Sequence, residues 1–253
     1  MIRAARLRHG DRAELVEHLG ELRRRVFTAL FAVIVATGVA FAFRGHLLDL
    51  LNTPLPADHA KPVTFSVTEP FATSLKVSIY AGFALALPLV LWQMWAFVAP
   101  AFNESAQRAA AWLVVAATAL FGVGLVFAYF VVLPAGVGFL TTFDSDIYDI
   151  QVRAADYYSF VSLTLLAVGV VFELPVFILG LVRFGVLSAA RLRRNRRIGY
   201  TAMAVLAVVL PGVDPITTAV MMGPLFLLFE SSVWLAWFFE RRWNAAAPLA
   251  YDH

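Results

Sequence analysis

The chain has 253 residues, of which 61% are hydrophobic and only 15% are charged, and its mean hydropathy is +0.78. An ordinary soluble domain is about half apolar and roughly a quarter charged, so a single water-soluble core is excluded. The chain has no cysteine, which excludes disulfides, thiolate metal ligands and cysteine nucleophiles. The net charge of +3 is compatible with a nucleic-acid binder until the positions of the charges are considered.

Six long runs with no more than one charged residue each organise the sequence. A helix needs about 20 mostly apolar residues to cross a hydrocarbon layer of about 30 Å. The runs cover residues 26–43, 77–103, 109–143, 157–182, 198–213 and 215–239. The third is too long for one straight crossing, so we expect its helix to stop near Pro134 and residues 135–143 to form an interfacial segment. The sequence predicts an all-α polytopic membrane protein with six transmembrane helices.

The positions of lysine and arginine predict the orientation, because cytoplasmic loops are enriched in these residues. On a six-span topology, 16 of the 20 basic residues fall on the side of the two termini. The other side receives Arg44, Lys61, Lys76 and Arg153. We therefore expect a cytoplasmic amphipathic segment at 1–25, one membrane domain at 26–240 and a short cytoplasmic tail at 241–253. A cleaved signal peptide is the alternative for the N-terminus, but no small-residue cleavage site follows the first run.

The N-terminal segment carries the first group of candidate binding residues. Leucines at helical spacing predict an amphipathic helix, on which Glu14, Glu17 and Glu21 share one face. One interpretation is a solvated face with local pairs such as Glu21 to Arg25. The other is a receptor for guanidinium groups, which carboxylates bind by charge-assisted, bidentate hydrogen bonds.

Several motifs of this chain resemble the TatC family, the multispanning receptor subunits of the twin-arginine protein translocase. The first is HLGELRRR at 18–25. Others are TEPF at 68–71 with Lys76, LP at 87–88, QMWAFVAP at 93–100, FAYF at 127–130 before Pro134, FELP at 172–175, and Asp214 with Pro224 and FE at 229–230. The resemblance covers about residues 14 to 240 and includes acids inside the predicted spans.

The resemblance implies a receptor for twin-arginine signal peptides and the core subunit of a Sec-independent translocase. Such a translocase exports folded proteins across the cytoplasmic membrane, driven by the proton-motive force. It further implies an oligomeric complex with TatA- and TatB-like single-span subunits, folded cargo carrying the signal, and a lipid bilayer around it. No enzymatic chemistry, cofactor, metal or nucleic-acid partner is implied.

For the signal-peptide site, the resemblance assigns the arginine pair to Glu21 and to an acid in the first cytoplasmic loop. The family's glutamate position in that loop is occupied here by Ala106, and Glu104 lies two residues earlier. We take Glu104 as the second candidate acceptor, with Arg23 orienting the site by local pairing and Glu17 extending the acidic surface. The family's outer motifs suggest structural roles for Glu69, Pro70, Lys76 and Asp214, although residues 211–215 read PGVDP where the family more often has TPPD.

Two glutamates lie inside predicted spans. A charge near the bilayer centre costs at least about 2.5 to 3.5 kcal/mol, so Glu173 and Glu230 should face protein, water or a cavity. At 1.5 Å per residue both lie about 15 Å from the cytoplasmic boundary. They either line a common concavity or separately hold helices together. We expect Glu173 and Gln93 to contact an apolar partner helix or the inserted signal through hydrogen bonds, and we count Glu230 and Phe97 as further candidate partner contacts.

The fifth run, 198–213, is short for a bilayer and is followed at once by the turn at 211–215. Local thinning of the bilayer is one consequence, and a cover formed by residues 44–74 over the outer helix ends is the alternative. Other classes of function fit less well. All five histidines lie outside the spans and no hydrolase motif occurs. A secondary transporter of a small solute or ion is the stronger alternative, because transporters share intramembrane acids and prolines, but the two halves show no convincing repeat.

Overall fold

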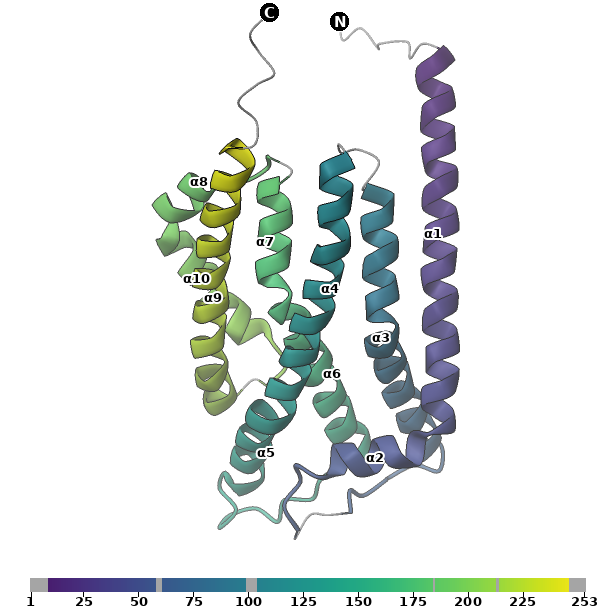
Figure 1. Ribbon diagram of the computed structural model, residues 1–253. Helices are drawn as coiled ribbons and strands as arrows, with labels where there is room; N and C mark the ends of the chain where they lie inside the picture. Colours follow the sequence, from purple (N-terminus) through teal and green to yellow (C-terminus); the bar gives the residue numbers. More distant parts are fainter. Residues whose placement is uncertain (1–8, 58–60, 99–103, 184, 213, 246–253) are drawn as a thin grey trace, which may run out of the picture.

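The computed structural model describes residues 9–57, 61–98, 104–183, 185–212 and 214–245, and these are helical apart from short connections (Figure 1). The elements are α1 (His9–Ala42), α2 (Arg44–Asn52), α3 (Glu69–Val98), α4 (Glu104–Phe127), the π-helix η3 (Ala128–Val132), α5 (Leu133–Thr142), α6 (Ala154–Phe172), α7 (Leu174–Arg183), α8 (Ala189–Arg194), α9 (Arg196–Val209) and α10 (Pro215–Ala245). The all-α prediction is confirmed.

Five helical segments are long and apolar enough to cross a membrane by length and composition. They are His18–Ala42, Glu69–Val98, Trp112–Thr142, Ala154–Arg183 and Pro215–Arg242. The predicted fifth span corresponds to α9, whose 14 residues extend about 21 Å at 1.5 Å per residue. In Figure 1 the turn between α9 and α10 stops short of the level that α2 and the end of α5 reach. That the chain crosses the membrane six times stays a prediction.

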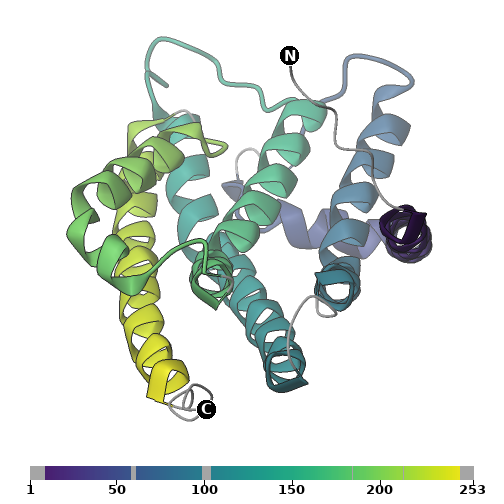
Figure 2. The same cartoon turned by 90° about the horizontal axis from the view of Figure 1, so that it is seen from above.

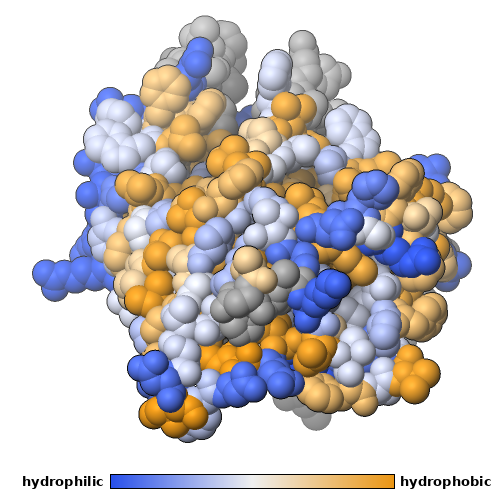
Figure 3. All heavy atoms as spheres, turned by 90° about the horizontal axis from the view of Figure 1, so that it is seen from below, coloured by the Kyte–Doolittle hydropathy of each residue, from blue (hydrophilic) through white to orange (hydrophobic). Residues whose placement is uncertain are grey.

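The start of α1 and the end of α10 lie together at one end of the bundle, the upper end of Figure 1. We call this the terminal end, and the opposite end, where α2 runs across the bundle, the α2 end. Seen from above, α1 lies at one edge of the molecule, and α8, α9 and α10 lie at the opposite edge (Figure 2). Figure 3 shows the α2 end, where hydrophilic side chains are interspersed with hydrophobic ones.

The third span does not end near Pro134, so that prediction is wrong. α4, η3 and α5 form one helical rod that continues to Thr142. Pro134 occupies the first turn of α5, directly after the π-helical turn. A proline there is tolerated because residues of a first turn need no N–H partner, and the wider π turn replaces the regular hydrogen-bond ladder just before it. Residues 135–142 are therefore part of the rod.

The first helix packs mainly against one neighbour. Only 6% of the apolar window of α1 is buried, and its long contact runs along α3. The two backbones approach closely at Gly82, where a Cβ atom would lie 2.6 Å from the backbone nitrogen of Thr37. Small residues permit such close helix packing in membranes. From Val26 to Val39, many large apolar side chains of α1 are exposed, as expected for a helix that faces lipid.

The main core lies on the other side of the molecule. Its buried residues come from η3, α6, α7, α9 and α10, with Val132, Met221, Leu225 and Val233 almost fully enclosed. The rod formed by α6 and α7 breaks at Glu173, which ends α6 one residue before α7 begins. Pro175 has no N–H for the regular ladder, and this accounts for the break. The break turns the Glu173 side chain into the space between α7 and α3.

Candidate functional site

The candidate signal site lies where α1 and α3 meet at the terminal end. Arg25 donates to the Glu21 carboxylate through Nε at 2.9 Å and through Nη2 at 2.6 Å, both to Oε1. Its Nη1 donates to Gln93 Oε1 of α3 at 3.3 Å. The local Glu21 to Arg25 pair is thus present, as the i, i+4 spacing predicts. Glu21 is therefore already paired with a guanidinium, that of Arg25 in the same helix.

The second carboxylate oxygen of Glu21 is less engaged. Its nearest charged neighbour is His18, with Nδ1 4.0 Å from Oε2, and 28% of the Glu21 side chain is exposed. The His18 ring stacks on Phe97 of α3, with ring centroids 4.3 Å apart and planes 19° apart. A flat aromatic pair beside an accessible carboxylate oxygen is a suitable environment for a planar guanidinium. Phe97 and Gln93 thus belong to the α1 contact, rather than facing Glu173.

Other predicted signal-binding residues are placed only in part. Arg23 is exposed, and Arg25 rather than Arg23 makes the described pairing to Glu21. Glu17 lies within α1 and Glu104 is the first residue of α4, but both side chains lie outside those the structure describes. The part of Glu104 in this site therefore stays a prediction.

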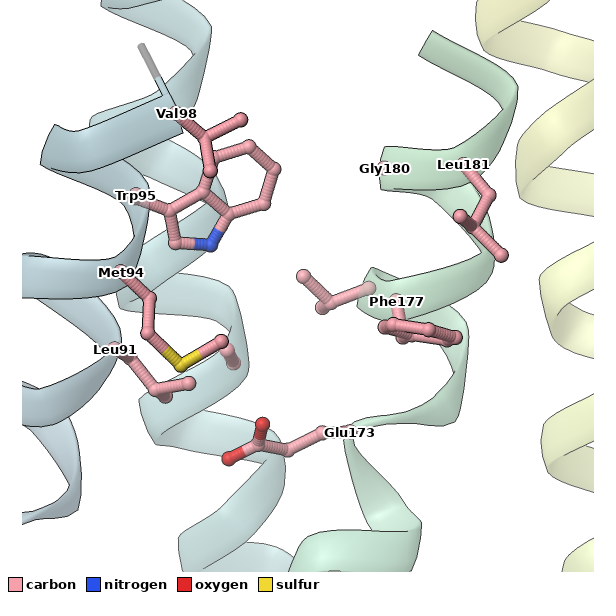
Figure 4. A pocket seen from close by; sticks show the side chains of 10 residues that line it. Leu91, Met94, Trp95, Val98, Glu173, Phe177, Gly180 and Leu181 are labelled. Atoms are coloured by element: carbon pink, nitrogen blue, oxygen red, sulfur yellow. The ribbon is translucent and has the colours of Figure 1, made fainter. Parts of the chain in front are cut away.

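A pocket of about 200 Å³ opens between α3 and α7, with Glu173 at its floor (Figure 4). Met94 and Trp95 of α3 face Phe177 of α7 across it, and the rest of its lining is apolar. Glu173 Oε1 is buried and has no hydrogen-bond partner among the described residues. A buried carboxyl without a partner costs folding free energy, so its position here favours a role in contacting another molecule.

The second intramembrane acid has a different environment. Glu230 of α10 accepts a short hydrogen bond from the Tyr200 hydroxyl and lies 3.2 Å from Nη2 of Arg196, both on α9. It does not line the Glu173 pocket. Of the two predicted arrangements, the common concavity is therefore wrong for Glu230, which instead joins α9 to α10. Arg196 is the first residue of α9, so its long side chain connects the start of α9 to α10.

At the α2 end, Glu69 is the centre of a polar clamp. It is 6% exposed and accepts Nε and Nη2 of Arg153 at 3.0 and 3.2 Å, together with the backbone N–H groups of Phe65 and Ala155. The Val63 N–H donates to the Val152 carbonyl and the Val63 carbonyl accepts the Ala154 N–H, both at 2.8 Å, on either side of Arg153. The hydrogen bonds and charge of Glu69 raise the pKa of the Arg153 guanidinium. One carboxylate thereby connects the loop before α3 to the start of α6.

The other predicted outer residues have simpler contacts. Pro70 lies in the first turn of α3, where the fixed φ of proline suits a helix start. Lys76 Nζ donates to Ser159 Oγ of α6 at 3.1 Å. Asp214 is 4% exposed, and its Oδ1 accepts the Thr217 N–H at 2.7 Å, which caps α10. All three contacts support helix packing or helix starts, in line with the structural role predicted for this group.

Comparison with known proteins gives the family of this chain. The family model of TatC, the Sec-independent protein translocase protein, matches residues 17–224. The chain belongs to the TatC family. The TatC protein of Carboxydothermus hydrogenoformans is 34% identical over 227 residues, which make up 89% of this chain and 93% of that protein. The TatC protein of Escherichia coli K12 is 33% identical over 232 residues, which make up 90% of each chain.

Solved structures agree with the sequence comparison. A crystal structure of the twin-arginine translocase receptor TatC matches with a TM-score of 0.75 at 32% identity, covering 87% of this chain and 98% of that one. A second TatC structure, in the detergent DDM, matches with a TM-score of 0.76. The TatC family assignment supports a multi-pass membrane protein that works in a Sec-independent translocase with other components of the Tat system. It does not support the solute transporter.

Some contacts of this TatC protein were not predicted from the sequence. The hydroxyls of Tyr129 and Tyr157 donate to the carbonyls of Leu50 and Leu51 at 2.9 and 2.8 Å, so they hold the end of α2. The available signal was a tyrosine within an apolar run or at its start, because a buried hydroxyl needs a partner. No periodicity in the sequence could have said that the partner is a backbone carbonyl of α2.

Proposed function

We propose that this chain is the receptor for twin-arginine signal peptides and the core subunit of its translocase, and that it binds the signal at the terminal end beside Glu21. The observation that carries the proposal is the geometry of Glu21. Its carboxylate accepts two hydrogen bonds from a guanidinium on Oε1, its side chain remains 28% exposed, and the stacked His18 and Phe97 rings lie beside it. A carboxylate in this state is selective for arginine over lysine, because only the guanidinium offers a planar fork of donors.

The distribution of charge supports an orientation with the terminal end in the cytoplasm. Arg183, the arginines of α8 and α9, and Arg241 with Arg242 all lie toward this end, whereas the α2 end carries few basic residues. By the enrichment of basic residues in cytoplasmic loops, both termini lie in the cytoplasm and the protein spans the cytoplasmic membrane. With α9 as the fifth of six spans, the folded cargo would approach from the side where Glu21 lies.

A binding experiment tests the receptor proposal. A fluorescent peptide with paired arginines is titrated into the purified full-length protein in nanodiscs, beside the same peptide with paired lysines. We expect Glu21→Gln to weaken binding of the arginine peptide by about tenfold or more, because a charge-assisted pair contributes about 1.5–3 kcal/mol. Glu240→Gln removes one negative charge at the same end and is the control. Equal binding by wild-type protein and Glu21→Gln would refute the site.

We further propose that the Glu173 pocket receives the apolar helix of a single-span TatA- or TatB-like subunit or the inserted signal. The pocket is apolar around one unpaired carboxyl oxygen, so a hydrogen-bond donor on an otherwise apolar helix is the matching occupant. Glu173→Gln keeps shape and hydrogen bonding, whereas Glu173→Leu removes both polar atoms. Site-specific crosslinking from Phe177 should capture the partner in the first variant more than in the second. Identical crosslinking in wild-type protein and both variants would contradict the proposal.

The short α9 supports a further part of the proposal, thinning of the bilayer beside the receptor. A span of about 21 Å against a layer of about 30 Å is a mismatch that lipids accommodate by local thinning. Thinning lowers the barrier for moving a large cargo without a fixed pore. A spin label at Gly212 reports its depth in the bilayer. Burial of the label below the headgroups supports thinning, and exposure to bulk water at normal headgroup height excludes it.

A further inference from the structure

The Glu21 site is occupied by a residue of the same helix. Arg25 donates two hydrogen bonds to one Glu21 oxygen and a third to Gln93 of α3. Arg25 thus links the Glu21 carboxylate to α3, and its side chain is 19% exposed, compared with 28% for Glu21. A signal-peptide guanidinium that binds Oε1 must therefore displace Arg25, or else it is confined to Oε2.

We propose that Arg25 is a resident competitor for the signal-peptide arginine, and that Gln93 holds it in place. The inference rests on the proposed function, because it takes Glu21 as the acceptor. In the free receptor, Arg25 occupies the Glu21 carboxylate and competes with other guanidinium groups for it. When the signal binds, its guanidinium takes the Glu21 oxygens in place of Arg25, which then also leaves Gln93. Arg25 thus sets the affinity threshold of the site without itself contacting the signal's arginine.

The consequence for affinity follows from simple competition. The apparent affinity of a ligand falls by the fraction of receptor in which its site is free. This factor is the same for every ligand that uses Glu21, so it leaves the arginine-to-lysine ratio unchanged but lowers all affinities together. The apparent affinity of ligands that make a single weak contact then becomes too low for binding, whereas a paired-arginine peptide with several contacts still binds. Return of Arg25 also gives an intramolecular route for releasing the signal.

A purely positioning role for Arg25 predicts the opposite result. If Arg25 served only to hold the Glu21 carboxylate in its binding rotamer, its removal would weaken signal binding. If Arg25 competes, its removal strengthens binding. The sign of the effect therefore separates the two roles, provided that the general loss of one positive charge near a cationic ligand is subtracted.

The test uses the same peptide titration with full-length protein in nanodiscs. Arg25→Gln should tighten binding of the paired-arginine peptide by about two- to fivefold, the range for a partly exposed ion pair. Arg24→Gln, an exposed neighbour with the same charge change, is the matched control and should tighten binding less. Gln93→Leu leaves the charges intact and should tighten binding by a smaller factor, because it releases only one contact of Arg25. This variant keeps the test informative if Arg25→Gln does not fold.

Three outcomes decide the matter. Tighter binding in Arg25→Gln than in Arg24→Gln that disappears in the Glu21→Gln background supports the competitor. Binding equal to or weaker than that of Arg24→Gln, while Glu21→Gln still abolishes binding, overturns the competitor and leaves the receptor proposal standing. Binding that does not depend on Glu21 at all overturns the receptor site itself, and the competitor with it.

Discussion

The two intramembrane glutamates should respond to the same substitution with opposite signs. Replacing Glu173 by Leu removes a buried oxygen that has no partner and fills part of an apolar pocket. An unsatisfied buried polar group costs about 1–3 kcal/mol, so we expect Glu173→Leu to stabilise the fold by about 1 kcal/mol. We place the expected stabilisation at the lower end of the range of about 1–3 kcal/mol because the pocket is open on one side.

Replacing Glu230 by Leu leaves Arg196 and the Tyr200 hydroxyl without their acceptor. Hydrogen bonds to charged groups contribute about 1.5–3 kcal/mol. The Glu230 and Arg196 side chains are 26% and 39% exposed, so solvent screening lowers the value to about 2 kcal/mol of destabilisation. The two Leu variants should then differ by about 3 kcal/mol in the free energy of unfolding, although both remove one carboxylate from an apolar helix.

Thermal unfolding of the purified protein in one detergent measures the difference, with tryptophan fluorescence as the readout. Glu173→Gln and Glu230→Gln serve as conservative controls and should fall between wild-type protein and the corresponding Leu variants. A midpoint that falls for both Leu variants by similar amounts would show that Glu173 has a partner in the folded state. If Glu173→Leu is both more stable and defective in partner capture, its carboxyl is retained for binding at the expense of stability.

The remaining predictions concern the α2 end and the last helix, each checked by thermal unfolding. Tyr157→Phe should cost about 1 kcal/mol, because it leaves a buried carbonyl of α2 without a donor, and hydrogen exchange should then quicken at the end of α2. Glu69→Gln should lower the midpoint clearly more than Asp156→Asn, which lies 4.0 Å from Arg153 and is 76% exposed; equal effects would argue against a buried clamp. Asp214→Ala should cost about 1 kcal/mol through loss of the α10 cap, and an unchanged midpoint would contradict that cap.

Hydropathy predicted most of the fold because the bilayer imposes a minimum length on each crossing. The runs of the first, second, fourth and sixth spans correspond to long helices of the structure. The stop at Pro134 was wrong because the rule for proline assumes an unbroken α-helical ladder. A π-helical turn just before the proline changes that ladder, and no residue pattern in FAYFVV announces it.

The partners of the polar side chains were harder to predict than the spans. In a soluble helix, hydrophobic periodicity shows which face is buried, but in a membrane both lipid and protein neighbours are apolar. Nothing in the sequence of α3 therefore indicates that Gln93 faces α1 while Met94, one residue later, faces the Glu173 pocket. For the same reason the pairing of Glu230 with α9 was only one of two alternatives. The local pair of Glu21 and Arg25 could be predicted because its spacing lies within one helix.

The contacts that fasten the helices are distributed unevenly along the bundle. At the α2 end, the Glu69 clamp, the tyrosine hydroxyls on α2 and the Lys76 to Ser159 bond tie α2, α3 and α6 to one another. At the terminal end, the contacts of α1 with α3 described above are the Arg25 to Gln93 hydrogen bond and the His18 to Phe97 ring stack, and a pocket separates α3 from α7. Buried, satisfied networks rigidify a structure, whereas a few part-exposed contacts exchange readily. Binding at the terminal end can therefore move α1 and the end of α3 without disturbing the clamped end.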